Sequence, residues 1–153
     1  FDLAIGNFPA APKRHVSRTL YQERFVGIVR RSHPKLDRRG RMSLSAFVAT
    51  PHALVSLRGD PHGLVDEALA QRGLKRRVAL TVAHFLALPF VVAASDMVGL
   101  LAQRAALRLS ESAGVTMFKP PLDLPSWDVQ ILAHEQRAEE PTIAWLANAI
   151  SAA

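Results

Sequence analysis

The chain has 153 residues, 49% of them hydrophobic, and its 19 lysines and arginines against 13 aspartates and glutamates give a net charge of +6. This is enough apolar material for one sizeable core or two small lobes. The chain contains no cysteine, which excludes disulfides and thiolate metal sites and favours a reducing, cytoplasmic location. The longest apolar run is interrupted by Pro89 and falls short of the roughly 20 residues that a membrane-spanning helix needs, so no membrane partner is expected. No signal peptide is recognised.

The first half of the chain reads as strands joined by loops. Strands are predicted over residues 1–6, 16–20, 24–29 and 51–56. A short helix at 43–47 would begin at the N-cap Ser43. The next helix, 64–72, is preceded by Asp60 as a plausible N-cap with Pro61 at the first helical position, and Gly73 would end it.

The second half alternates between strands and helices. Strands are predicted at 77–82, 97–101, 115–118 and 127–133, and helices at 84–94, 103–109 and 141–149. From residue 52 onward this alternation predicts a mainly parallel sheet covered by helices. On the last helix, Trp145 and Leu146 are expected on the buried stripe.

The stretch Ala83-His84-Phe85 follows the strand at 77–82 and opens a helix-like segment. Ligands bind at such handovers because free backbone N–H groups and the positive end of the helix dipole point into the crevice. The imidazole of His84 could donate to a carboxylate or phenolic oxygen, and Phe85 could flank an aromatic ring. The alternative is that His84 only caps the helix or is a satisfied core residue.

Much of the positive charge lies in the cluster Arg30-Arg31-Ser32-His33-Pro34-Lys35-Leu36-Asp37-Arg38-Arg39-Gly40-Arg41. One interpretation is a phosphate-binding patch for nucleic acid. A solvated loop that keeps the protein soluble is favoured, because the cluster has few aromatic stacking groups and spans turn signals rather than one helix face.

Metal, cofactor and catalytic motifs are not found. His15, His33, His52 and His134 are scattered without the spacing of metal ligands. The segment Gly59-Asp60-Pro61-His62-Gly63 lacks the spacing and the lysine of a phosphate loop, and there is no nucleophile elbow. The sequence therefore predicts no enzyme, no cofactor and no metal.

Several motifs, in order along the chain, resemble those of one family. These are Phe1-Asp2-Leu3-Ala4-Ile5-Gly6, the segment 20–34 ending in Arg30-Arg31-Ser32-His33-Pro34, Met42-Ser43-Leu44-Ser45-Ala46-Phe47, the segment 73–85, Ser95-Asp96-Met97-Val98 and the closing Trp145-Leu146. Together they resemble the effector-binding domain of LysR-type transcriptional regulators. The segment 73–85 is close to the subgroup that responds to aromatic acids, phenols and flavonoids.

The resemblance implies an α/β, type 2 periplasmic-binding-protein-like fold with two Rossmann-like lobes joined by two crossing strands. Residues 31–127 would form the second lobe, and residues 1–30 and 128–153 an incomplete first lobe. The family's N-terminal winged helix-turn-helix is absent from this sequence. The chain would then sense a small, aromatic acid in the interlobe cleft. Its partners would be other copies in a homodimer or homotetramer, and promoter DNA only through the absent domain.

The candidate effector contacts are His84, Phe85, His62, Asn7, Phe8, Arg58, Phe118 and Trp127. His62 and Arg58 flank the turn after the strand at 51–56, where the subgroup places a polar residue facing the cleft. Asn7 and Phe8 follow the first strand. Phe118 and Trp127 lie near the second crossing between lobes, where an aromatic residue is alternatively hinge core.

Two other classes of function stay open at this stage. A solute-binding protein of a transporter has the same fold, although no secretion signal is seen. A nucleic-acid-binding module would use the basic cluster at 30–41, and salt-dependent binding to duplex DNA would reveal it.

Overall fold

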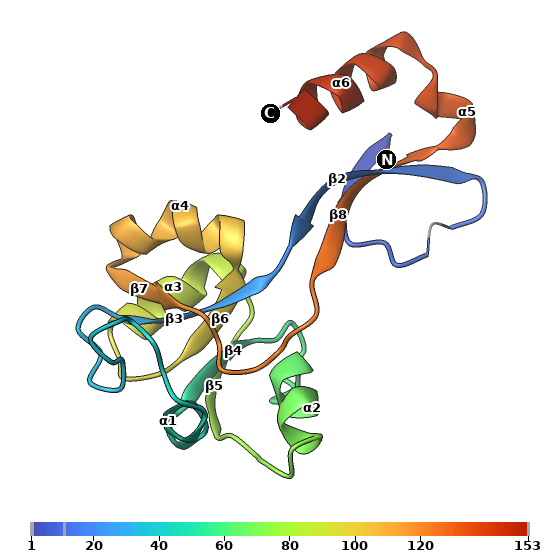
Figure 1. The fold of residues 1–153 in the computed structure, drawn as a ribbon. Coiled ribbons are helices and arrows are strands. Elements are labelled where there is room, and N and C mark those ends of the chain that lie inside the picture. The colour runs from blue at the N-terminus through green and yellow to red at the C-terminus, as the bar shows by residue number, and fades with distance from the viewer. Residues whose placement is uncertain (1, 11, 153) are drawn as a thin grey trace. The chain divides into compact units, whose positions relative to one another are not determined.

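Figure 1 shows the computed structural model of the chain, which describes residues 2–10 and 12–152. The chain divides into two compact units: unit 1 is Phe1–Glu23 with Ser126–Ala153, and unit 2 is Arg24–Pro125. The sequence placed these divisions at 30/31 and 127/128. The first division comes earlier because the strand β3, Phe25–Arg30, pairs with strands of unit 2. No helix within the described residues is long and apolar enough to cross a membrane.

Unit 1 is a three-stranded antiparallel sheet followed by two helices. Its strands are β1 (Leu3–Gly6), β2 (His15–Glu23) and β8 (Trp127–His134), in the order β1-β8-β2. The helices α5 (Glu135–Ala138) and α6 (Pro141–Ala152) follow β8. All three strands were predicted, although residue 1 of the first prediction lies outside the described residues.

The expected buried stripe on α6 is wrong in part. Ile143 is buried, but Trp145 is 69% and Leu146 39% exposed. The helix is tethered to β2 through Arg18, which donates to the side-chain oxygen of Asn148 and to the carbonyl of Ala147. Apolar spacing on a helix shows which face can be buried, but whether an element covers that face depends on the neighbours.

Unit 2 is built on a mixed five-stranded arrangement. Besides β3 it contains β4 (His52–Val55), β5 (Val78–Val82), β6 (Gly99–Ala102) and β7 (Val115–Phe118). Strand β4 is parallel to β5, and a parallel bridge from His52 to Val98 connects β4 to the residue before β6. Strand β3 is antiparallel to both β6 and β7. The four strands after residue 52 therefore run in one direction, as predicted, and only the earlier β3 is reversed.

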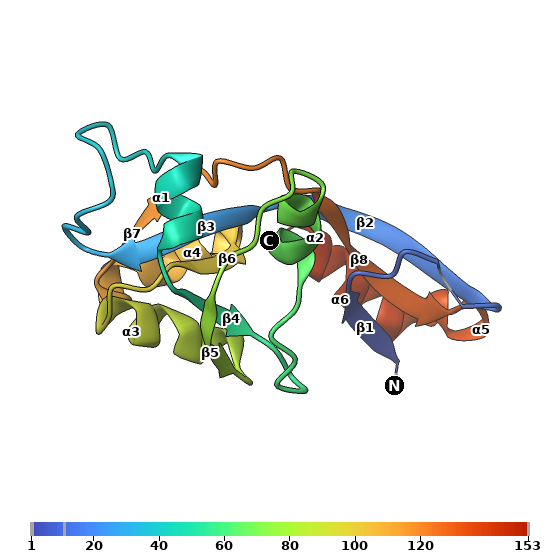
Figure 2. The same cartoon turned by 90° about the horizontal axis from the view of Figure 1, so that it is seen from below.

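Helices cover both faces of the strands of unit 2. Helices α3 (Leu88–Ala93) and α4 (Gln103–Ala113) belong to one face, and α1 (Leu44–Ala49) and α2 (Leu64–Ala70) to the other. In Figure 2, α1 and α3 lie on opposite sides of the strands. Because side chains alternate along a strand, Ile28 packs toward α3 while its neighbour Val29 packs toward α1. This alternation gives unit 2 two separate core layers.

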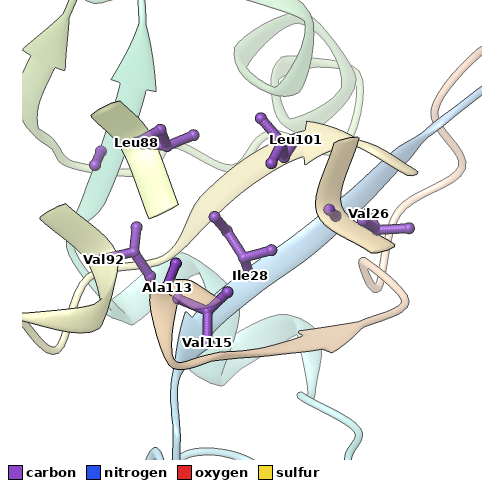
Figure 3. Close-up of a cluster of buried hydrophobic side chains, with 9 residues drawn as sticks. Val26, Ile28, Leu88, Val92, Leu101, Ala113 and Val115 are labelled. Carbon is purple, nitrogen blue, oxygen red and sulfur yellow. The ribbon is translucent and has the colours of Figure 1, made fainter. Parts of the chain in front are cut away.

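The core layer beneath α3 and α4 holds fully buried aliphatic side chains. Ile28 of β3, Leu88 and Val92 of α3, and Leu101 of β6 are each no more than 1% exposed. Figure 3 shows them gathered with Val26, Ala113 and Val115 between the strands and the two helices. Burying such a side chain stabilises the fold by about 1.5–3 kcal/mol, so this layer fixes unit 2 as a rigid base for its loops.

The ends of the helices on the other face follow local capping rules. The Ser43 hydroxyl accepts the Ala46 N–H at 3.2 Å, which confirms the predicted N-cap of α1. Gly73 adopts φ +67° just beyond α2, as predicted for the glycine that ends this helix. Asp60 is not the N-cap of α2 and Pro61 is not its first residue, because α2 begins only at Leu64 with Gly63 as its N-cap. The Asp66 carboxylate accepts the N–H of Gly63.

The predicted continuous helix over 84–94 is also wrong at its start. His84 remains extended, with φ −125° and ψ 129°, and a short 3-10 turn, η1 (Phe85–Ala87), precedes α3. Proline has no N–H and is tolerated only in the first turn of an α-helix, so Pro89 restricts α3 to begin at Leu88. As a result the segment 83–87 is a surface turn rather than a helix end.

Candidate functional site

A hollow of about 180 Å³ lies within unit 2 at the carboxyl ends of β4 and β5. We refer to it as the unit 2 hollow, and its lining residues are Phe25, Ala53, Leu54, Val55, His62, Gly63, Leu64, Val65, Arg76, Phe85 and Leu100. Because β4 and β5 are parallel, the loops that follow them meet at the same edge. Two predicted contact residues, His62 and Phe85, are brought together here from these two loops.

The segment that carries His62 is held by two aspartates. The Asp60 carboxylate accepts the His62 N–H at 2.9 Å, and the Asp66 carboxylate accepts the Gly63 N–H at 2.9 Å. These bonds fix the backbone between the turn and the first residues of α2. The imidazole of His62 is exposed, and apart from Arg76 the other lining side chains are apolar, so the hollow offers a polar group at its rim above a mostly apolar floor.

A buried polar network lies behind this wall. The side chain of Arg76 is 1% exposed and that of Asp66 14%. Arg76 donates from Nε to Asp66 Oδ1 at 2.9 Å and from Nη2 to Asp66 Oδ2 at 2.7 Å, which is the bidentate geometry of a strong ion pair. Its Nη1 lies 3.1 Å from His52 Nδ1, and His52 Nε2 lies 2.8 Å from the carbonyl oxygen of Phe47.

The partners of His52 define its tautomer. A carbonyl oxygen only accepts, so Nε2 carries the proton and donates to Phe47, while Nδ1 accepts from Arg76. Burial, with a smaller contribution from the charge of Arg76, lowers the pKa of His52 to about 4 against the opposing effect of the Phe47 hydrogen bond. His52 is therefore neutral at pH 7. Burial raises the pKa of Asp66, but the hydrogen bond and charge of Arg76 outweigh it and hold the pKa below its ordinary value.

A second hollow, of about 410 Å³, lies within unit 1. Its lining residues are Asn7, Phe8, Pro9, Gln22, Ser126, Trp127, Asp128 and Gln130. Three predicted contacts, Asn7, Phe8 and Trp127, are brought together in this unit 1 hollow. The pairing of β1 with β8 explains the meeting, since Gly6, which precedes Asn7 and Phe8, is opposite Gln130 on the strand that begins at Trp127. On the other side of β8, β2 places Gln22 opposite Asp128.

A third hollow, of about 470 Å³, lies in unit 2 between the beginning of β3 and the segment after β7, and Phe118 is one of its lining residues. Phe118 is nevertheless 4% exposed and belongs to the core layer beneath α1 and α2. Its ring packs edge-on to Phe47 at 6.4 Å and lies so close to Gly27 that a Cβ there would overlap it. The hinge-core alternative raised for Phe118 fits this packing.

The remaining two predicted contacts lie outside these three hollows. His84 and Arg58 are exposed. Sequence reasoning missed three residues of the buried network, namely His52, Arg76 and Asp66. The sequence carries no signal that separates Arg76 from the adjacent Lys75 and Arg77, because only burial distinguishes them.

The basic cluster at 30–41 forms a series of turns, as the loop interpretation predicted. Arg30 pairs with Asp96 at 2.6 Å and Arg41 with Asp37 at 3.1 Å, so part of its charge is compensated. The backbone N–H of Arg41 is the main cause that lowers the pKa of Asp37. Within the described residues there is no group of three or more histidine, aspartate or glutamate side chains that could share a metal ion.

The family described as LysR substrate binding domain matches residues 1–153. The chain belongs to this family. Among curated proteins, the HTH-type transcriptional activator NagR of Ralstonia sp is 32% identical over 145 residues, which cover 95% of this chain and 48% of NagR. The HTH-type transcriptional regulator SyrM of Rhizobium meliloti is 29% identical over 153 residues, 99% of this chain and 46% of SyrM. The LysR-family chain thus spans about half the length of these relatives, which are named as regulators and not as enzymes.

Solved structures agree with this assignment. A probable transcriptional regulator, PA0477 of Pseudomonas aeruginosa, superposes with a TM-score of 0.81 at 29% identity and covers 97% of this chain and 48% of its own. The regulatory domain of MexT, a transcriptional activator in Pseudomonas aeruginosa, has a TM-score of 0.81 at 25% identity. The match covers 99% of this chain and 72% of the MexT chain. These matches confirm the predicted α/β, periplasmic-binding-protein-like fold class of this LysR domain.

Proposed function

We propose that this LysR domain is the effector-sensing part of a bacterial, cytoplasmic transcriptional regulator and that it binds a small aromatic acid. The observation that carries the proposal is the unit 2 hollow, which lies where the loops after two parallel strands meet. Apolar hollows with a few polar groups at such an edge are the usual sites for small ligands in α/β folds.

The residues of the unit 2 hollow have complementary roles in this proposal. Phe85 flanks the aromatic ring, which the aliphatic side chains of β4 and α2 also contact. The imidazole of His62 donates a hydrogen bond to the ligand's carboxylate or phenolic oxygen at the rim. His84 and Arg58 stay candidate contacts from the same two loops.

Unit 1 contributes a different set of groups. Its hollow is lined by the amides of Asn7, Gln22 and Gln130, with Phe8 and Trp127 beside them. The side-chain oxygen of Gln130 is buried and, among the described residues, has no hydrogen-bond partner. An amide-lined hollow suits a ligand group with hydrogen-bond donors. Phe118 acts as a packing residue of unit 2 rather than as a direct contact.

The regulatory mechanism that follows is a shift in populations. An effector that binds one arrangement of the units better than another changes how subunits pack in a homodimer or homotetramer. Promoter DNA would be bound through a helix-turn-helix domain outside residues 1–153. Relatives named as transcriptional regulators favour this function over the solute-binding alternative, and the ion-paired turns of the 30–41 cluster favour it over a nucleic-acid-binding module.

A thermal-shift screen of the protein that contains this chain tests the proposal, with aromatic and aliphatic carboxylates as ligands. A ligand at about a hundred times its dissociation constant adds roughly 2.7 kcal/mol to the free energy of unfolding. For a domain of this size the expected rise in Tm is on the order of 5–10 °C. No rise with any aromatic acid, in a well-folded protein, would remove the aromatic effector.

Matched variants locate the site. Phe85→Leu should reduce the ligand-induced rise in Tm, whereas Phe90→Leu should not, because Phe90 is equally exposed but does not line the hollow. His62→Ala and His84→Ala distinguish the two histidine candidates: loss of the rise only in His84→Ala would move the binding site from the unit 2 hollow to the turn at 83–87.

A further inference from the structure

The network behind the unit 2 hollow is continuous from one helix end to another. It runs from the Phe47 carbonyl, in α1, through His52 and Arg76 to the Asp66 carboxylate, in the first turn of α2. Asp66 Oδ2 accepts from both Arg76 Nη2 and the N–H of Gly63. Both Gly63 and Arg76 line the hollow, so a single oxygen atom couples its wall to the buried core.

Fold stability alone does not account for such a network. Removing two charges from water costs several kcal/mol per ion, and well-packed hydrophobic residues often replace a buried ion pair at no loss of stability. What the network supplies is geometry: the planar guanidinium holds Asp66 through two parallel bonds and His52 through a third. The segment 62–64 is then fixed relative to β4, from which His52 projects.

The network also sets the charge of the hollow. The one cation in the floor, Arg76, is already neutralised by Asp66 and is 1% exposed. His52 is neutral because it is buried, and its two ring nitrogens are bonded to a carbonyl and a guanidinium. Among the lining side chains, the guanidinium of Arg76 therefore presents no uncompensated charge to a ligand.

We propose that His52, Arg76 and Asp66 are positioning residues that hold the segment 62–64 and keep the floor of the unit 2 hollow neutral, so that it receives a ligand's uncharged ring and not its carboxylate. The ligand part of this inference rests on the proposed function. The positioning part concerns the protein alone and has its own readout.

The test uses substitutions in the protein that contains this chain, with benzoate as the probe. Asp66→Asn keeps the shape of the side chain but removes its charge, and the control Glu67→Gln makes the same change at the next, exposed position. Since Asp66→Asn leaves a buried arginine unpaired and can prevent folding, the double variant Asp66→Asn/Arg76→Gln removes both charges together.

Two quantities are measured: hydrogen exchange of the peptide that spans residues 58–69, and the dissociation constant of benzoate. We expect faster exchange and a dissociation constant raised about tenfold in the double variant, because hydrogen bonds to charged groups are lost, and no change in Glu67→Gln. A purely structural role would change Tm but leave the dissociation constant of the folded variant as it was.

The outcomes separate the proposals. A folded double variant with unchanged exchange overturns the positioning role, whatever ligand binds. Tighter benzoate binding in Asp66→Asn would make Arg76 itself the anion site and overturn the neutral floor. A wild-type protein that binds no aromatic acid would remove the proposed aromatic effector, while the exchange measurement would still decide whether the network holds the segment 62–64.

Discussion

The two units contain similar elements but differ in how far their apolar faces are covered. In unit 2, both faces of the strands carry helices, and side chains such as Ile28 and Phe47 are fully buried. In unit 1, three antiparallel strands are followed by α6, whose Trp145 remains largely exposed within the described residues. Unit 2 therefore has the rigidity to hold a defined site on its loops, whereas the position of α6 depends on few contacts such as those of Arg18.

A matched pair of leucine substitutions gives the largest expected difference between the units. Leu88→Ala in α3 should lower the free energy of unfolding by about 2–5 kcal/mol, because a fully buried side chain leaves a cavity. Leu146→Ala in α6 should cost less than about 1 kcal/mol, because that side chain is 39% exposed. Urea unfolding of both variants measures the difference. An equal loss of unfolding free energy in the two variants would contradict the difference in burial between the units, and would show that Leu146 on α6 is covered in the protein.

The buried histidine of unit 2 predicts a dependence of stability on pH. Since the pKa of His52 is about 4 in the folded state and 6.5 for a histidine in water, the unfolded chain takes up a proton first as the pH falls. The stabilisation is complete above pH 6.5 and is lost between pH 6.5 and 4, by about 3 kcal/mol in total. Asp66, with its lowered pKa, adds a loss only at still lower pH.

Chemical denaturation at pH 7.5, 5.5 and 4.5 measures this loss. His52→Gln should remove most of the change with pH between 6.5 and 4, while His84→Ala should retain it, because His84 is exposed and His52 is not. If wild-type stability is the same at pH 7.5 and 4.5, then His52 is protonated in the folded protein and its bonds to Arg76 and Phe47 are not as described.

The contrast between the units also shows what the sequence could predict. The apolar runs of unit 2, the Ser43 cap and the glycine at 73 were sufficient to place its strands, the start of α1 and the end of α2, because these signals are local. The resemblance to LysR regulators supplied the fold class. It also directed attention to His62 and Phe85, which the structure brings together in one hollow.

The rest depends on three-dimensional burial that local patterns do not encode. Arg76 is one of three consecutive cations, and only the fold turns its guanidinium inward to Asp66. The sequence shows His52 only as one of several scattered histidines. Its position on β4 in the fold brings its ring against that of Phe47. On α6 the apolar spacing did not decide which side chains are buried, since Ile143 is buried while Trp145 is 69% exposed within the described residues.

Tryptophan fluorescence tests directly whether Trp145 on α6 is exposed to solvent. The chain has two tryptophans, so Trp127→Phe leaves Trp145 as its only tryptophan, whose emission is excited selectively at wavelengths that tyrosine does not absorb. With 69% of its surface exposed, Trp145 should be quenched efficiently by acrylamide in a protein that consists of residues 1–153, and its emission should be red-shifted. Trp145→Phe provides the control, since Trp127 is partly buried.

Weak quenching of Trp145 would mean that its face of α6 is covered, either by a second copy of the chain or by a change in the position of the helix. Repeating the measurement over a hundredfold range of protein concentration would separate these two causes, because only association between copies depends on concentration.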